Sequence, residues 1–273
     1  MADRRDFLKT AATATAALAV ATPKASALVR RFRFGGAPDP EALALAGIDA
    51  ARSAGAQYAD ARVGRYRRQS VGTRERQVTN VSDSESFGIG IRALVDGAWG
   101  FAATNDLSLD AVAKTAAEAV RTARAAKRAQ RRPVELAPVT PDSGTWQTPV
   151  QVDPLEIPIE DKVALLLAAN ASALKVANVR FANSGIASLR EVKTLATTDG
   201  TLVTQTFYRI APSFSATAIG SGDFQSYNEE LAPRGAGWEY ITALDMPTNG
   251  EKWASLAAEK LGAKSVDVGR YDL

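Results

Sequence analysis

Two residue types that carry much of enzyme chemistry are absent from this chain, because its 273 residues include no histidine and no cysteine. A serine or cysteine nucleophile normally needs an imidazole base beside it, and catalytic zinc normally has imidazole or thiolate ligands. The carboxylates that remain suit magnesium or calcium better than zinc. The sequence therefore excludes a soft-metal site and a histidine proton shuttle built from its own side chains.

Three short patterns could still suggest a site, and each has a plainer structural interpretation. Ser221 lies between two glycines but has no base to activate it. Glu229 and Glu230 are neighbours in sequence, which is more typical of a solvated loop than of an acid and base pair. Gly88 and Gly90 lie inside an expected strand with no helix after them, so they do not form a dinucleotide loop. We predict no catalytic, cofactor-binding or metal-ligating residue in this chain.

The aromatic residues are candidates for contact rather than for chemistry. Trp99 and Phe101 could touch a peptide, but side chains of this kind more often belong to a core. Tyr227, Trp238 and Tyr240 fall in a region expected to be loop, where exposed rings favour a partner interface. We expect Trp99 and Phe101 to pack in a core. We expect the aromatic residues at 227, 238 and 240 to contact a partner.

The first 27 residues have the features of an export signal. Arg4 and Arg5 precede an alanine-rich, uncharged run over 10–22 that is too short and too weakly apolar to span a bilayer. The Ala-Ser-Ala sequence at 25–27 suits a signal peptidase. The pattern resembles a twin-arginine signal cleaved after Ala27, which predicts a periplasmic or otherwise exported protein. The alternative is a disordered basic N-terminus.

The net charge gives no reason to expect a nucleic-acid partner. The formal charge is +3, and removal of the signal, with four basic and two acidic residues, leaves about +1. The basic residues near 127–132 fall at an expected helix C-terminus, where cations are favoured, and no aromatic residues interleave with them. After cleavage, no segment is apolar and long enough to span a membrane. We therefore predict neither nucleic-acid binding nor a membrane span.

Hydrophobic periodicity and turn residues predict an α+β fold with two subdomains, each with helices packed on a mainly antiparallel, curved sheet. Expected helices are 40–53, 108–131, 159–177 and 253–261. Expected strands are 58–66, 69–81, 87–94, 98–102, 179–181, 189–197, 202–208 and 213–219, with a further strand beginning at 265–273. Tight hairpin turns are expected at Asp96-Gly97 and at 198–201.

Six prolines interrupt residues 133–158, which we interpret as the connection between the subdomains. The predicted organisation is a signal peptide at 1–27, a first subdomain at 28–132, this connection, and a second subdomain at 159–273. The last strand has no closing turn or cap, so the second subdomain is expected to be truncated. An exposed sheet edge would then favour aggregation, which predicts poor solubility.

Four segments resemble the N-terminal half of the TldD/PmbA family of metallopeptidases, over nearly all of the chain after the signal. The segments are Gly55–Arg62, Gly88–Thr104, Thr198–Thr201 with Gln205 beyond it, and Val268–Leu273. The second segment is long and quite specific, whereas the turn motif alone is weak. The resemblance implies a homodimer, or a heterodimer of a TldD-like and a PmbA-like subunit, that encloses a chamber for unfolded peptides.

The resemblance also implies zinc held by a His-Glu-x-x-x-His helix, and no position here matches a ligand of that metal. We therefore expect the N-terminal portion of a zinc-dependent peptidase, with the zinc-binding C-terminal domain missing and the zinc confined to the full-length parent. This portion would supply dimer contacts and chamber wall, and would be inactive alone. The alternative is a non-catalytic PmbA-like partner or scaffold subunit. A carboxylate-only hydrolase has the least support.

Overall fold

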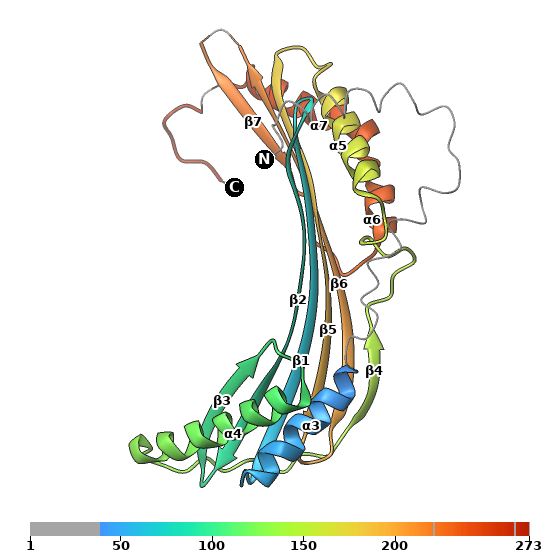
Figure 1. Cartoon of the computed structure of the whole chain (residues 1–273). Helices are drawn as coiled ribbons and strands as arrows, with labels where there is room; N and C mark the ends of the chain where they lie inside the picture. Colours follow the sequence, from blue (N-terminus) through green and yellow to red (C-terminus); the bar gives the residue numbers. More distant parts are fainter. Residues whose placement is uncertain (1–38, 221, 265, 273) are drawn as a thin grey trace, which may run out of the picture. The chain divides into compact units, whose positions relative to one another are not determined.

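A long, seven-stranded sheet is the frame of the described part of the chain (Figure 1). The computed structural model describes residues 39–220, 222–264 and 266–272. The signal predicted at 1–27 lies outside these residues, as does Ser221. The strands are β1 (Tyr58–Arg74), β2 (Gln77–Val95), β3 (Ala98–Thr104), β4 (Ser143–Gln147), β5 (Val179–Thr197), β6 (Leu202–Ile219) and β7 (Phe224–Glu229).

The strand order is β3-β2-β1-β5-β6-β4, and β7 pairs with β6 beside this path. Every pairing is antiparallel except that of β4 with β6. Consecutive strands that are connected by short turns favour antiparallel pairing. β1 also pairs with β5, although several other elements lie between these two strands in the sequence. β3 pairs only with residues 89–95, so the outer edge of β2 before residue 89 has no strand beside it in the described part.

The central strands are far longer than predicted, at 17 to 19 residues each. The predicted break near 67–68 is wrong, and so is the one near 82–86, because both stretches are paired in the β1–β2 ladder, whose register shifts only near Gly72 and Thr73. The hairpin turn lies instead at Glu75 and Arg76, where Glu75 has a φ of 46°. Cross-strand ion pairs keep this polar stretch in the sheet. Arg67 and Asp83, for example, are 3.0 Å apart.

The described residues form five α-helices, which pack on the same sheet or on one another. They are α3 (Pro40–Ser53), α4 (Leu109–Ala126), α5 (Ile159–Ala173), α6 (Trp238–Leu244) and α7 (Met246–Lys260). The predicted caps are confirmed, since Asp39 accepts from the Glu41 amide at 3.1 Å and Ser108 accepts from the Ala111 amide at 3.2 Å. Sequence periodicity placed the ends of α4 and α5 several residues too far along the chain.

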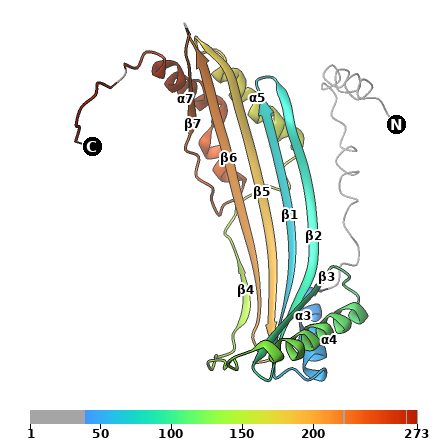
Figure 2. The same ribbon diagram turned by 90° about the vertical axis from the view of Figure 1, so that its left-hand side faces the viewer.

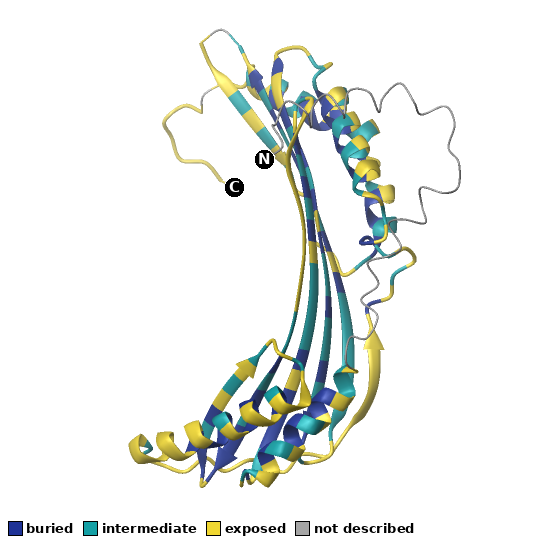
Figure 3. Ribbon diagram, in the orientation of Figure 1, coloured by how far each residue is buried: buried dark blue, intermediate teal, exposed yellow. Residues whose placement is uncertain are grey.

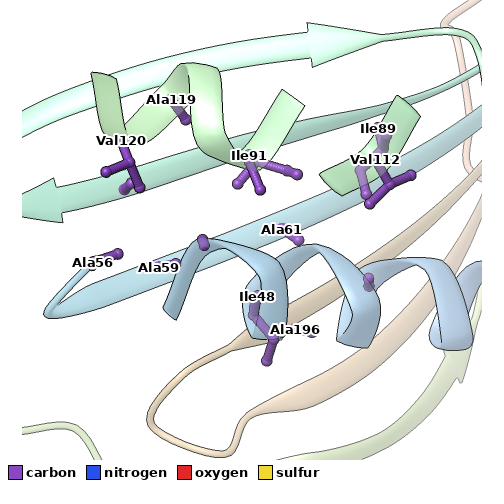
Figure 4. Packing of buried hydrophobic residues seen from close by; sticks show 14 of the residues in the cluster. Ile48, Ala56, Ala59, Ala61, Ile89, Ile91, Val112, Ala119, Val120 and Ala196 are labelled. Atoms are coloured by element: carbon purple, nitrogen blue, oxygen red, sulfur yellow. The ribbon is translucent and has the colours of Figure 1, made fainter. Parts of the chain in front are cut away.

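The first core lies where α3 and α4 pack on the ends of β1, β2 and β3 (Figure 4). Most of its residues are alanine, valine or isoleucine, with Ala61 and Ile91 paired on β1 and β2 and both fully buried. Small side chains on α4, such as Ala119, allow the helix to lie close to the sheet. This core fixes one end of the long strands.

The second core lies at the other end of the same strands, under α5 and α7 (Figure 1). The rings of Phe214 and Trp253 pack here at a tilt of 54°, with their centroids 5.1 Å apart. Ile186 and Ile241 are buried in this cluster, and Gly250 of α7 packs against the backbone of α5. The long strands therefore carry one core at each end.

The predicted α+β class, with helices on a mainly antiparallel sheet, is confirmed. The strands beneath both cores belong to one continuous sheet, and residues 39–273 form one unit by their contacts. The connection at 133–158 contains the strand β4, which was not predicted because prolines interrupt this part of the sequence. The boundaries of the two predicted subdomains stay a prediction.

The turn predictions are confirmed, and two predictions near the C-terminus are wrong. Asp96 and Gly97 have φ values of 49° and 78°, and Gly200 has a φ of 99°. The region predicted as loop contains β7 and α6. Residues 266–272 form no strand, although the Val-x-Val pattern predicted one, because no neighbouring strand pairs with them in the described structure.

Candidate functional site

One face of the sheet is free of helices along its middle, and we call it the open face. Side chains alternate along a strand, so the odd-numbered β1 residues, such as Val63 and Val71, enter the two cores. The even-numbered residues 60–74 point the other way. Together with their cross-strand partners they make up the open face. Figure 2 views the sheet with α5 and α7 behind β5 and β6.

Aromatic and cationic side chains meet in three cross-strand rows in the middle of the open face. The rows are Arg68–Leu189–Arg209, Tyr66–Glu191–Phe207 and Gly64–Lys193–Gln205. Trp146 of β4 pairs with Gln205, and its ring centroid lies 5.2 Å from that of Phe207. We call this group the aromatic–cation band. Its members are Tyr66, Arg68, Trp146, Glu191, Lys193, Phe207 and Arg209.

Cation–π contacts hold the positive groups of the band over the rings. The Arg68 guanidinium lies 4.9 Å from the centre of the Tyr66 ring. Lys193 and Arg209 lie 5.3 Å and 5.8 Å from the centre of the Phe207 ring. Such contacts orient a cation without neutralising it. The band therefore presents positive charge beside aromatic rings.

Glu191 is the single carboxylate of the band, and it is almost fully buried. Its oxygens lie 3.1 Å from Lys193 Nζ and 3.5 Å from Arg209 Nη1. Burial acts to raise the pKa of Glu191, but the hydrogen bonds from Lys193 and Tyr66 outweigh it and lower the pKa. Glu191 is thus ionised at neutral pH, and the band keeps an excess of positive charge.

A hollow of about 790 Å³ with a mixed polar and apolar lining lies beside the band, toward β7. Its polar lining includes Ser70, Asn80, Asn183, Ser213, Asn228 and Glu229. Gly72 and Gly185 are directly paired in its floor. A Cβ on Gly185 would lie 3.0 Å from Ser213 Oγ and 3.3 Å from the Val71 carbonyl oxygen, so glycine keeps the floor low. The hollow can accept a hydrogen-bonding chain at close range.

A second cationic group lies at the other end of the open face. Asp60 is buried and accepts a salt bridge from Arg92 at 2.7 Å, with Arg62 at 3.5 Å. The hydrogen bond to Asp60 raises the pKa of Arg92, whose guanidinium lies 4.9 Å from the centre of the Trp99 ring. Trp99 is half-buried, but Phe101 is 59% exposed, so the prediction that Phe101 packs in a core is wrong. Phe101 pairs with Arg92, which in turn pairs with Asp60, so its side chain lies on the open face.

The opposite face holds a buried polar network between the two cores. Lys162 of α5 is 1% exposed and donates to the Gln69 side chain and, at 2.5 Å, to the Pro154 carbonyl oxygen. Gln69 in turn donates to Asp83 at 3.0 Å. Burial, and to a smaller extent the nearby Arg67, lower the pKa of Lys162 to about 8. The network ties α5 to β1 and to the proline-rich connection.

The residues that sequence patterns singled out do not come together as a site. Glu229 ends β7 and accepts from the Tyr227 hydroxyl at 3.0 Å, while Gly90 lies inside β2. Tyr240 is buried in α6, so the prediction that it is an exposed loop aromatic is wrong. The open face was missed, because residues 66–70 are all polar or aromatic, with Arg67 and Gln69 on the other face, and show no apolar alternation that could have indicated it.

A metal is not held by the side chains that the structure describes. They contain no group of three or more Asp or Glu residues placed to hold a metal ion, and the whole chain has no histidine or cysteine. The donor set therefore does not fit zinc. No helix among residues 39–273, as far as described, is long and apolar enough to cross a membrane.

Two family models match this chain and together cover about two thirds of it. The PmbA/TldA metallopeptidase domain 1 matches residues 59–123, and the PmbA/TldA metallopeptidase central domain matches residues 152–265. The first match contains β2, β3 and most of β1 and α4. The second contains the strands and helices of the second core.

The metalloprotease slr0863 of Synechocystis is 28% identical over 207 residues, which are 66% of this chain and 42% of that protein. A Thermotoga maritima protein, proposed to be a modulator of a DNA gyrase, matches in structure with a TM-score of 0.64 and 16% identity, over 84% of this chain and 50% of that one. TldE of Thermococcus kodakarensis matches with a TM-score of 0.53 and 14% identity, over 79% and 46%. The structural likenesses show the fold, and the chain spans about half the length of these relatives or less.

Proposed function

The chain belongs to the PmbA/TldD metallopeptidase family, and from this we propose that it forms the polypeptide-binding wall of a peptidase. The observation that carries the proposal is the open face. It joins a band of cations and aromatic rings to a hollow of mixed polarity, with Gly72 and Gly185 in its floor. An unfolded polypeptide offers amide groups and mixed side chains, which such a surface can bind without a deep specific pocket.

The chemistry of peptide hydrolysis is assigned to groups outside this chain. The family name implies a metal, but the side chains present here do not fit one. We derive no catalytic step from these residues. Their role in the proposal is to hold and orient the polypeptide, and to contribute contacts to a second subunit in a homodimer or heterodimer.

A non-catalytic partner subunit is the second candidate function. The complete lack of histidine and cysteine favours it, because such a subunit needs no metal ligands of its own. Co-expression with a full-length family member from the same organism tests this idea. Stable co-purification supports it, whereas a folded chain that stays monomeric in that mixture contradicts it.

Export through the twin-arginine pathway is also part of the proposal, based on Arg4, Arg5 and the segment 25–27. Cell fractionation of the full chain compares the native sequence with a variant in which both arginines are lysine. We expect the native chain in the exported fraction, shortened after Ala27, and the variant retained in the cytoplasm. Equal distribution of the two would count against export.

Site-specific photo-cross-linking tests the polypeptide-binding wall. A photoreactive amino acid replaces Ser213 in the hollow, and in the control variant it replaces Lys114, which is exposed on α4. Each purified full-length protein is illuminated with an unfolded substrate protein and with the same protein in a folded form. We expect adducts from position 213 with the unfolded form alone. Equal labelling at position 114 would refute the assignment.

A further inference from the structure

We propose that the aromatic–cation band selects acidic segments of extended polypeptide. This inference rests on the proposed function and names the class of substrate that the open face prefers. The band carries three cations and one carboxylate, so its charge is complementary to a chain segment rich in Asp or Glu.

The excess charge is available to a ligand because little inside the chain neutralises it. Arg68 is exposed and has no acidic partner within 4.0 Å among the described residues. Lys193 and Arg209 share the single buried carboxylate of Glu191, while their own side chains remain 40% and 57% exposed. A second carboxylate from a ligand would therefore meet positive groups that are already in place.

The spacing of the cations fits an extended chain. Arg68 and Arg209 lie in one row with only Leu189 between them, so their backbones are about 10 Å apart. In an extended peptide with the polyproline II conformation, residues i and i+3 lie on the same side of the chain and are separated by about 9 Å. Carboxylates three residues apart can therefore reach both guanidinium groups from one chain that crosses the strands.

The aromatic rings favour a polypeptide over a purely ionic ligand. Trp146 is 49% exposed and tilts by 50° against Phe207, which leaves an apolar surface beside the cations. Backbone and apolar side chains between the carboxylates can lie on these rings. The adjoining hollow, with its paired Gly72 and Gly185, continues the path for the main chain.

Fluorescence anisotropy with the purified full chain tests the preference. The probes are labelled, unstructured Gly/Ser peptides that carry glutamate, glutamine or lysine at every third position, and a labelled single-stranded RNA. We expect the glutamate peptide to bind more tightly than the glutamine peptide, with an advantage that falls as salt is raised. The lysine peptide is expected to bind least.

A pair of charge-matched variants locates the effect. Arg68→Gln combined with Arg209→Gln should weaken the glutamate peptide by roughly five- to twentyfold, as expected for the loss of two exposed ion pairs, and should leave the glutamine peptide unchanged. Arg128→Gln combined with Arg131→Gln removes the same charge from an exposed segment after α4 and should change neither. The double lysine variant at 68 and 209 should restore part of the preference.

Four results would count against the proposal. Equal affinity for the glutamate and glutamine peptides would overturn the acidic preference while leaving the polypeptide-binding wall standing. An equal loss in both double glutamine variants would mean that net charge, and not the band, causes the effect. RNA that binds more tightly than any peptide, and is lost with Arg68 and Arg209, would reassign the band to nucleic acid. Absence of all peptide binding would contradict the proposed function, that the chain forms a polypeptide-binding wall.

Discussion

Replacing Gly100 by alanine should disrupt the first core, because β3 and α4 touch at this position without room for a side chain. A Cβ on Gly100 would overlap the Ala119 carbonyl oxygen and the Ala123 amide nitrogen, and would lie 3.0 Å from the Ala123 Cα. All three atoms belong to the backbone of a helix, so no side-chain rotation can relieve the contact. The helix must move away from the strand.

The expected cost is at least about 3 kcal/mol, at the upper end of the range for overpacked cores. The smaller freedom of the unfolded alanine chain offsets less than about 1 kcal/mol of this. For a unit of this size the loss corresponds to a fall in melting temperature of roughly 6–12 °C. Urea unfolding followed by far-UV circular dichroism, together with thermal melts, measures both quantities.

Gly90→Ala is the matched control, since Gly90 also lies within a strand of the same sheet. A Cβ there would meet only the Phe101 ring, at 3.0 Å and 3.2 Å, and that ring is exposed and can turn away. We expect a change within about 1 kcal/mol. If Gly100→Ala were as stable as Gly90→Ala, the close approach of α4 to β3 would be wrong.

Three further predictions concern stability, pH and metal. Because burial lowers the pKa of Lys162 to about 8, below its unfolded value near 10.4, the cost of burying the charge is complete below pH 8 and fades as pH rises through 10. The stability of the native chain relative to Lys162→Met should therefore rise by up to roughly 3 kcal/mol over that interval in urea titrations, and parallel pH profiles would refute this. Ser108→Ala should cost about 1 kcal/mol by removing the cap of α4, which thermal melts would detect, whereas Ser143→Ala in β4 should have little effect. The purified chain alone should hold no stoichiometric zinc by elemental analysis and should not degrade an unfolded protein, and bound zinc with proteolysis that a chelator abolishes would contradict the assignment of hydrolysis elsewhere.

The middle of the sheet shows why strand boundaries were hard to predict. Residues 77–86 of β2 are all exposed, and serine and acidic residues break the usual hydrophobic alternation there (Figure 3). Periodicity signals a strand only where one face enters a core, and no residue of this stretch belongs to either core. Continuous backbone pairing with β1 decides its conformation, and pairing is not visible in local sequence.

The positions of the band and the hollow could not be predicted either, because they depend on the register between strands. Arg68 and Arg209 are 141 positions apart in sequence, and only the alignment of β1, β5 and β6 places them in one row. The sequence alone contained a polar run at 66–70 without apolar alternation, and it did not show which strand lies beside it. A shift of one residue would send every one of these side chains to the other face.

The sequence by itself determined what this chain lacks and how its local elements begin. The absence of histidine and cysteine excluded a zinc site of its own, the caps at Asp39 and Ser108 fixed two helix starts, and Asp96-Gly97 fixed a turn. These properties depend on composition or on a few adjacent residues. Tertiary structure alone decided that one sheet serves both cores and that cations from β1, β5 and β6 share one face, because strand pairing joins residues that are distant in sequence.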